Sequence, residues 1–116
     1  MIKIGVCGFG TVGQSFVNHV LAYKDKIIKN CGRDICISII ADRSIERKKF
    51  KTESIEFTSD ILSVLDSDCD LVVELIGGTD LAYDLVRGAI SKKKSVITAN
   101  KALIAEKGED VASFVY

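Results

Sequence analysis

The sequence predicts an α/β domain, in which helices cover both faces of a doubly wound, mostly parallel sheet and so build three layers. Three observations support this fold class. Apolar, β-branched runs alternate with stretches of helical spacing along the whole chain. A cluster of glycines follows the first run at once and opens the first helical stretch. The length of 116 residues, 47% of them hydrophobic, suits one domain with a small core.

The first half of the chain contains two expected strands around one long helix. Residues 2–7 (IKIGVC) are short, apolar and β-branched, as a buried strand is. A helix is expected over 14–30, where apolar residues mostly recur at helical spacing, with Gly32 as its stop. Residues 35–41 (ICISIIA) are the second strand. Residues 45–54 are polar and basic, which predicts a solvated loop.

The second half continues the alternation of strand and helix. A short strand is expected at 55–58, then a helix around 61–65 capped by Thr58 or Ser59, and a long strand at 70–76. A helix capped by Thr79 follows, with its apolar face over 81–90. The last expected elements are a strand at 95–98, a short helix at 100–106 and a helix from 109. We therefore expect a single domain, residues 1–116, truncated in its last helix.

Composition excludes several classes of protein. Sixteen basic and sixteen acidic residues cancel, so no attraction to nucleic acid or to an anionic membrane is expected. No apolar run approaches the roughly 20 residues of a membrane span, and a strand begins too early to leave room for a signal peptide. A cytoplasmic protein is expected. The four cysteines lie far apart, with no C-x-x-C pair and one histidine in the chain, so they are expected to be reduced and mostly buried rather than zinc ligands.

The first candidate site is the run Gly8-Phe9-Gly10-Thr11-Val12-Gly13, which has the spacing G-x-G-x-x-G. A strand precedes it and a helix follows, as in a Rossmann-type dinucleotide fold. Gly8 would permit the tight turn, Gly10 would let a phosphate approach the main chain, and Gly13 would let the helix pack against the strand. The free N–H groups at the helix start would then hold the pyrophosphate. The alternative is a glycine turn without a ligand.

The second candidate is the pair Asp42 and Arg43, at the end of the second expected strand. An acid at this corner accepts hydrogen bonds from the adenosine ribose, which favours NAD. A guanidinium here can pair with a 2′-phosphate, which favours NADP, and the basic residues up to Lys51 point the same way. Alternatively, Arg43 and the lysines form a solvated loop. The choice between the two cofactors stays open.

Two further candidates follow later strands, at the carboxyl edge where ligands bind in such sheets. Ile76-Gly77-Gly78-Thr79 can pass close to a nicotinamide ribose, or can be a plain turn with Thr79 as the helix cap. In Thr98-Ala99-Asn100-Lys101, the lysine can stabilise alkoxide character on a substrate during hydride transfer, or can simply be exposed.

Two other titratable residues carry weaker signals. His19 is expected to be an ordinary residue of the first helix, at or near the surface. Glu74 lies inside an apolar strand, where it is either buried and paired or placed at the rim of the sheet.

Three segments resemble the NAD(P)-binding domain of homoserine dehydrogenase: GFGTVG at 8–13, VELIGGT at 73–79 and VITANKALIA at 96–105. The last two are more specific than the glycine pattern, and the resemblance runs the whole length of the chain. It implies an oxidoreductase that interconverts L-homoserine and L-aspartate 4-semialdehyde with NAD or NADP. That reaction belongs to the biosynthesis of threonine, methionine and isoleucine.

The resemblance also assigns roles to single residues. It implies that cofactor phosphate and ribose contact Phe9, Thr11 and Val12, that the nicotinamide ribose lies along Ile76 and Gly77 with Thr98 and Asn100 nearby, and that the catalytic lysine between cofactor and substrate is Lys101. NADP-preferring members often carry an arginine just before the aspartate that ends the second strand. Here that place is Ala41, and the arginine follows as Arg43.

Members of the family continue into a substrate and dimerisation domain, which holds a second catalytic lysine and acidic substrate ligands. The resemblance therefore implies a homodimer and a small-molecule substrate for the full-length enzyme, and cofactor binding without efficient turnover for this chain. Two alternatives stay open: a non-catalytic nucleotide-sensing module, and the first domain of another NAD(P)-dependent oxidoreductase.

Overall fold

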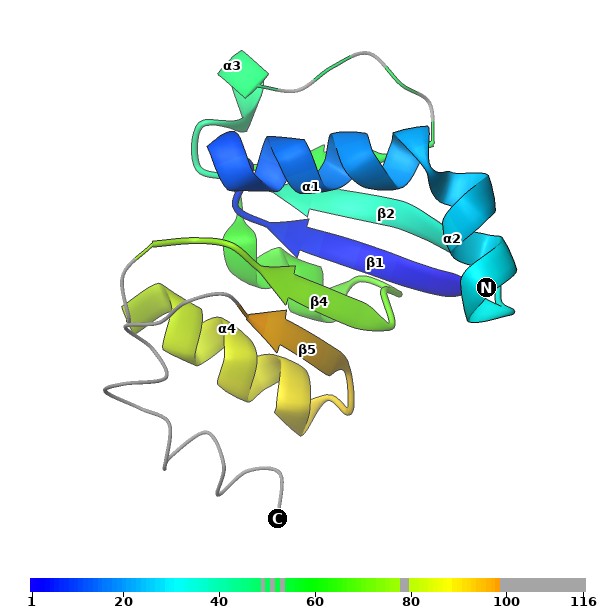
Figure 1. Ribbon diagram of the computed structural model, residues 1–116. Helices are drawn as coiled ribbons and strands as arrows, with labels where there is room; N and C mark the ends of the chain where they lie inside the picture. Colours follow the sequence, from blue (N-terminus) through cyan, green and yellow to red (C-terminus); the bar gives the residue numbers. More distant parts are fainter. Residues whose placement is uncertain (49, 51, 53, 78–79, 99–116) are drawn as a thin grey trace.

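The computed structural model describes residues 1–48, 50, 52, 54–77 and 80–98. Within them, five strands form one sheet in the order β3-β2-β1-β4-β5, and every neighbouring pair is parallel (Figure 1). The strands are β1 (Ile2–Cys7), β2 (Ile35–Ala41), β3 (Glu56–Thr58), β4 (Leu71–Glu74) and β5 (Ser95–Thr98). The predicted α/β fold class is confirmed.

Helices cover both faces of the sheet, as a parallel sheet requires. On one face, α1 (Thr11–Ala22) and α2 (Lys24–Cys31) bury an apolar stripe against β1 and β2 (Figure 1). On the other face, the 3₁₀ helix η1 (Ile61–Asp66) and α4 (Asp80–Ser91) pack on a second apolar cluster. The three-layer arrangement predicted from the alternating pattern is therefore present.

The strand order reverses between β1 and β4. From β1 the chain builds outward through β2 to β3, and then returns to the other side of β1 to add β4 and β5. Ligands of open α/β sheets bind at such a reversal, beyond the carboxyl ends of the strands. Here two backbone hydrogen bonds join the segments that leave the sheet: Gly8 N to Ala41 O and Leu75 N to Cys7 O, both 2.8 Å.

The single helix expected over 14–30 is two helices. The first begins at Thr11, directly after Gly10, and ends at Ala22; its C-cap Tyr23 has φ −114° and ψ 21° and is also the N-cap of α2. Residues 24–26 are all polar, and the next apolar residue is Ile27. The apolar stripe that packs on the sheet is therefore interrupted between α1 and α2. The stop at Gly32 is confirmed, since this glycine caps α2 in the left-handed conformation with φ 76°.

The prediction of a solvated loop over residues 45–54 is partly wrong. Its first four residues form the short helix α3 (Ile45–Lys48), and Ile45 is buried in the core. An Asx turn explains this start, because the Ser44 amide donates to the Asp42 carboxylate at 2.7 Å. Phe50 also packs on the domain: its ring lies edge-on to the Phe57 ring, with the two ring centroids 5.3 Å apart.

The remaining differences concern the ends of elements. The helix around 61–65 is a 3₁₀ helix whose cap is Asp60, without a side-chain cap, so the prediction of Thr58 or Ser59 as the cap is wrong. The strand expected over 70–76 is paired only over Leu71–Glu74. The expected cap Thr79 and the two helices expected beyond residue 99 lie outside the described residues.

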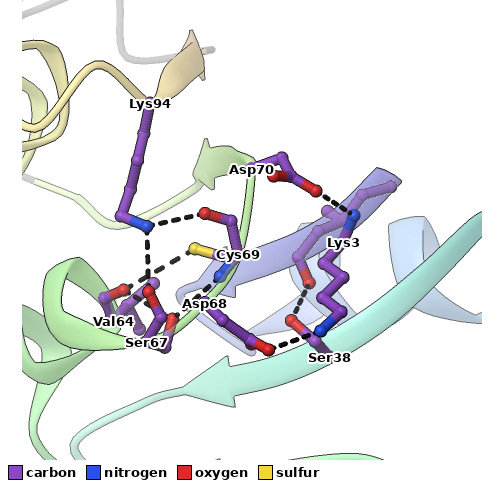
Figure 2. Close-up of polar contacts among 9 residues, drawn as sticks. Lys3, Ser38, Val64, Ser67, Asp68, Cys69, Asp70 and Lys94 are labelled. Carbon is purple, nitrogen blue, oxygen red and sulfur yellow. Dashed lines mark hydrogen bonds and ion pairs between the residues drawn. The ribbon is translucent and has the colours of Figure 1, made fainter. Parts of the chain in front are cut away.

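At the amino ends of the strands, polar contacts join β1, β2, β4 and the segment after α4 (Figure 2). The Lys3 side chain pairs with Asp68, and the Lys3 amide donates to the Asp70 carboxylate at 2.9 Å. Lys94 donates to the carbonyls of Ser67 and Cys69, at 2.9 and 2.6 Å. The adjoining hollow of about 660 Å³ is larger than the cleft described below, but it lies at the edge of the sheet opposite the reversal site.

All four cysteines are free thiols. Cys7 and Cys69 are buried, but Cys31 is exposed and Cys36 half-buried, so the prediction that most are buried is wrong in part. Burial, with smaller contributions from Cys69 and Glu74, raises the pKa of the Cys7 thiol to about 12. Within the part of the chain that the structure describes, no helix is long and apolar enough to cross a membrane.

Candidate functional site

The three motif glycines form a tight turn between β1 and α1. Gly8 has φ +101°, and a Cβ there would lie 2.7 Å from the carbonyl oxygen of Leu75. A Cβ on Gly13 would lie 2.0 Å from the carbonyl oxygen of Gly8. Both positions therefore require glycine: Gly8 for its conformation and its contact with the segment after β4, and Gly13 for the close approach of α1 to the turn.

Gly10 differs from these two glycines. A Cβ built on it meets no described atom within 4 Å beyond its chain neighbours, so the space above it is open. Gly10 is also the N-cap of α1 and provides no side-chain cap. The first amides of a helix have no intrahelical partners, and the helix dipole adds positive potential there. Gly8, Gly10 and the first turn of α1 thus form an open cradle, called here the glycine cradle, that suits an anion.

Two of the three residues that the resemblance assigned to phosphate and ribose lie on the outside of this turn. Thr11 is exposed, and the Val12 side chain is 62% exposed. The third, Phe9, is buried in the core beside the Phe50 ring. Its amide also donates to the Asp42 carboxylate at 2.7 Å. The Phe9 ring is therefore part of the core, and its amide is engaged with Asp42.

Asp42 joins the glycine cradle to the end of β2. The residue is 9% exposed, and its carboxylate accepts hydrogen bonds from the amides of Phe9 and Ser44, each at 2.7 Å. The Lys48 ammonium lies 3.1 Å from both carboxylate oxygens. Asp42 is therefore at the corner where an adenosine ribose would sit, but the protein itself already occupies most of its capacity as an acceptor.

Burial alone would raise the pKa of Asp42. The Phe9 and Ser44 amides and the Lys48 ammonium outweigh burial and hold this pKa below its ordinary value. Because the folded-state pKa is lowered, the resulting stability is present above the ordinary carboxyl pKa and is lost as the pH falls through the folded value.

We expect Asp42→Asn to destabilise the fold most at neutral pH, and the difference from wild type to shrink as the pH falls below about 4. Unfolding free energies from urea titrations across a pH series measure this difference. The same difference at every pH would contradict the role given to the ionised carboxylate.

The glycine cradle and Asp42 line one cleft of about 330 Å³ at the reversal of strand order. Its remaining walls come from Arg43, Lys48, Ile61, Leu75, Ile76, Gly77 and Leu81. Sequence reasoning placed Lys48 in a solvated basic loop and missed its contact with Asp42. The available signal was local: an Asp-x-Ser turn followed by helix-forming residues predicts a helical turn that brings Lys48 back over Asp42.

The other end of the cleft is bounded by the segment after β4. Ile76 and Gly77 line the cleft, and Thr98 ends β5 beside Glu74 in the strand register. Glu74 is buried and hydrogen-bonded, which resolves the alternative left open for it. Gly78, Asn100 and Lys101 lie outside the described residues. His19 is exposed on α1, as expected, and its ring contacts Tyr23.

The parallel sheet, the reversal of strand order and an open glycine cradle at a helix N-terminus together define a dinucleotide-binding domain of the Rossmann type. The open space at Gly10 fits a diphosphate, because main-chain amides border it and no side chain of the described residues fills it.

Comparisons with known proteins identify the family. The family model described as homoserine dehydrogenase, NAD binding domain, matches residues 8–113. Homoserine dehydrogenase of Pseudomonas aeruginosa is 42% identical over 95% of this chain and 25% of its own length. A crystal structure of a homoserine dehydrogenase from Thiobacillus denitrificans superposes with a TM-score of 0.89 at 33% identity, over 98% of this chain and 27% of that one.

The chain belongs to the family of homoserine dehydrogenase NAD-binding domains. The cofactor of this family of domains is NAD or NADP. The chain spans about a quarter of the length of the curated relatives it matches.

Proposed function

We propose that the chain is the cofactor-binding part of an enzyme that interconverts L-homoserine and L-aspartate 4-semialdehyde in amino-acid biosynthesis. The open glycine cradle at the start of α1 carries this proposal. The family of the chain supports the choice of substrate. The full-length enzyme is proposed to be a cytoplasmic homodimer.

The residues of the cleft divide by the part of the cofactor that they would hold. The amides of Gly10, Thr11 and Val12 would bind the diphosphate, since they begin α1 beside the open space. Ile76, Gly77 and Thr98 would border the nicotinamide end, which supplies or accepts hydride when the cofactor is bound. Asn100 is proposed to lie near this end, as the family resemblance implies.

At the adenosine end, we propose that the domain prefers NADP. The Asp42 carboxylate already accepts bonds from two amides and from Lys48, so little of it is left for ribose hydroxyls. Lys48 also offsets the negative charge that would repel a 2′-phosphate. Arg43 is exposed on the same cleft, and its guanidinium can bind a phosphate through two parallel hydrogen bonds.

The proposed function predicts that NADPH raises the melting temperature of the chain, and that NADH does so less. At 100 times the dissociation constant, a ligand that binds only the folded state stabilises it by about 2.7 kcal/mol, which corresponds to a rise of several degrees. Lys48→Ala should reduce the rise with NADPH and not that with NADH. No shift with either cofactor at millimolar concentration would contradict cofactor binding, and equal shifts would contradict the preference.

Lys101 is proposed to be the catalytic residue, a cation placed between cofactor and substrate that stabilises alkoxide character at the reacting oxygen. In the full-length enzyme, Lys101→Ala should lower kcat for homoserine and leave the Kd for NADPH unchanged. Steady-state kinetics and isothermal titration separate these two effects. A variant that retained full kcat would remove Lys101 from the reaction.

A further inference from the structure

The main-chain amides of residues 10–13 have no hydrogen-bond partner among the described residues. The Phe9 amide before them donates to Asp42. The Gln14 amide after them donates to the Gly10 carbonyl at 2.8 Å. Four consecutive donors are therefore left at the start of α1, where Gly10 lines the cleft. An anion is held only by donors that point toward it, so the orientation of each peptide group in this turn decides what the turn can bind.

Gly10 gives one of these peptide groups unusual freedom. The Gly10 N–H and the Phe9 carbonyl belong to the same trans peptide group, in which they point in opposite directions. Because glycine has no Cβ, this peptide group can turn over at little steric cost. It would then present a carbonyl oxygen to the cleft in place of an N–H, and two oxygens that only accept hydrogen bonds cannot pair. The glycine that leaves room for a phosphate thus also leaves its own donor poorly fixed.

The side chain of Gln14 holds this peptide group. Its Nε2 donates to the Phe9 carbonyl at 2.9 Å, and only the nitrogen of this side-chain amide can face a carbonyl. Gln14 is half-buried and does not line the cleft, whereas Gly10 does. With the carbonyl drawn toward Gln14, the Gly10 N–H faces the opposite way. The bond to Asp42 cannot fix this orientation, because the Phe9 amide belongs to the preceding peptide group.

We propose that Gln14 is a positioning residue that keeps the Gly10 amide turned toward the diphosphate of a bound dinucleotide. Gln14 acts through the Phe9–Gly10 peptide group and does not touch the ligand itself. The glycine pattern ends at Gly13, so it does not include this residue. This role rests on the proposed function, because it requires a diphosphate in the glycine cradle.

The test combines titration calorimetry with NADPH and amide NMR spectra of the chain. Gln14→Met keeps the length and the helix propensity of the side chain but removes its donor. We expect this variant to raise the Kd for NADPH by about tenfold, the effect of one hydrogen bond to a charged group. Its melting temperature without ligand should stay close to that of wild type, because the side chain is only half-buried.

Asn18→Met is the matched control. Asn18 lies one turn further along α1, is exposed, and makes no side-chain hydrogen bond among the described residues. The same replacement there should leave the Kd for NADPH within about twofold of the wild-type value, as an exposed substitution usually does.

The NMR signal of the Gly10 amide separates an orienting role from a structural one. A phosphate that accepts this N–H moves the signal of its proton downfield in wild type. In Gln14→Met saturated with NADPH, this movement should be lost, while the amides of Thr11 and Val12 still respond. If all three amides lose their response together, the variant has only loosened the start of α1, and the inference is wrong.

Three further results would overturn it. If Gln14→Met binds NADPH as tightly as wild type does, the Gln14 side chain does not orient a donor for the ligand. If NADPH binds to wild type without moving the Gly10 signal, this amide does not hold the diphosphate; that measurement carries the test if Gln14→Met does not fold. If calorimetry shows no binding of NADPH to the wild-type chain, the proposed function itself fails, and the role of Gln14 falls with it.

Discussion

Gly10→Val is expected to abolish cofactor binding while leaving the fold intact. The space above Gly10 is open, and its φ of −79° is accessible to any residue, so the valine side chain causes no clash within the described structure. It does occupy the place next to the first amides of α1. Loss of two hydrogen bonds to a charged group, at about 1.5–3 kcal/mol each, weakens binding by roughly 100-fold or more.

Two measurements distinguish this outcome from simple unfolding. The melting temperature of Gly10→Val without ligand should lie close to that of wild type, and the rise with NADPH should disappear. If Gly10→Val binds NADPH as tightly as wild type does, the diphosphate does not lie on these amides.

Gly13→Ala is expected to destabilise the fold by about 3 kcal/mol, at the upper end of the usual cost of overpacking. The added Cβ would lie 2.0 Å from the Gly8 carbonyl oxygen. That atom belongs to the backbone of the turn, which β1 and the segment after β4 hold in place. The helix must therefore move away from the turn, which also widens the glycine cradle.

Unfolding in urea measures the loss of stability. The comparison of Gly13→Ala with Gly10→Val separates two properties of one motif, since the first should mainly lower stability and the second mainly lower affinity. Equal stability of Gly13→Ala and wild type would show that α1 does not depend on this close approach.

The strands could be predicted well from the sequence because their apolar runs are dense and short. β1, β2 and β5 have the expected bounds. The third long run was predicted to extend to Ile76, yet pairing ends at Glu74. Hydrophobicity reports burial and not the partner of an amide, and the Ile76 amide turns to the Glu74 side chain instead of a strand.

Helix ends and the candidate site were harder to predict than the strands, because they depend on contacts between segments that are distant in sequence. The glycine spacing predicted the turn, because the steric requirement is local. The partners of Asp42 could not be predicted in the same way, since the Phe9 amide is 33 residues away in sequence. The burial of the Phe9 ring and the contact of Lys48 with Asp42 likewise appear only when β1, β2 and α3 come together.

The bond from the Phe9 amide to Asp42 has a consequence for the thermodynamics of recognition. It anchors the turn after β1 to the turn after β2 before any ligand arrives. The conformational entropy of this turn is therefore lost when the chain folds, and not again when a nucleotide binds. Little of the free energy of nucleotide binding is therefore needed to order this turn.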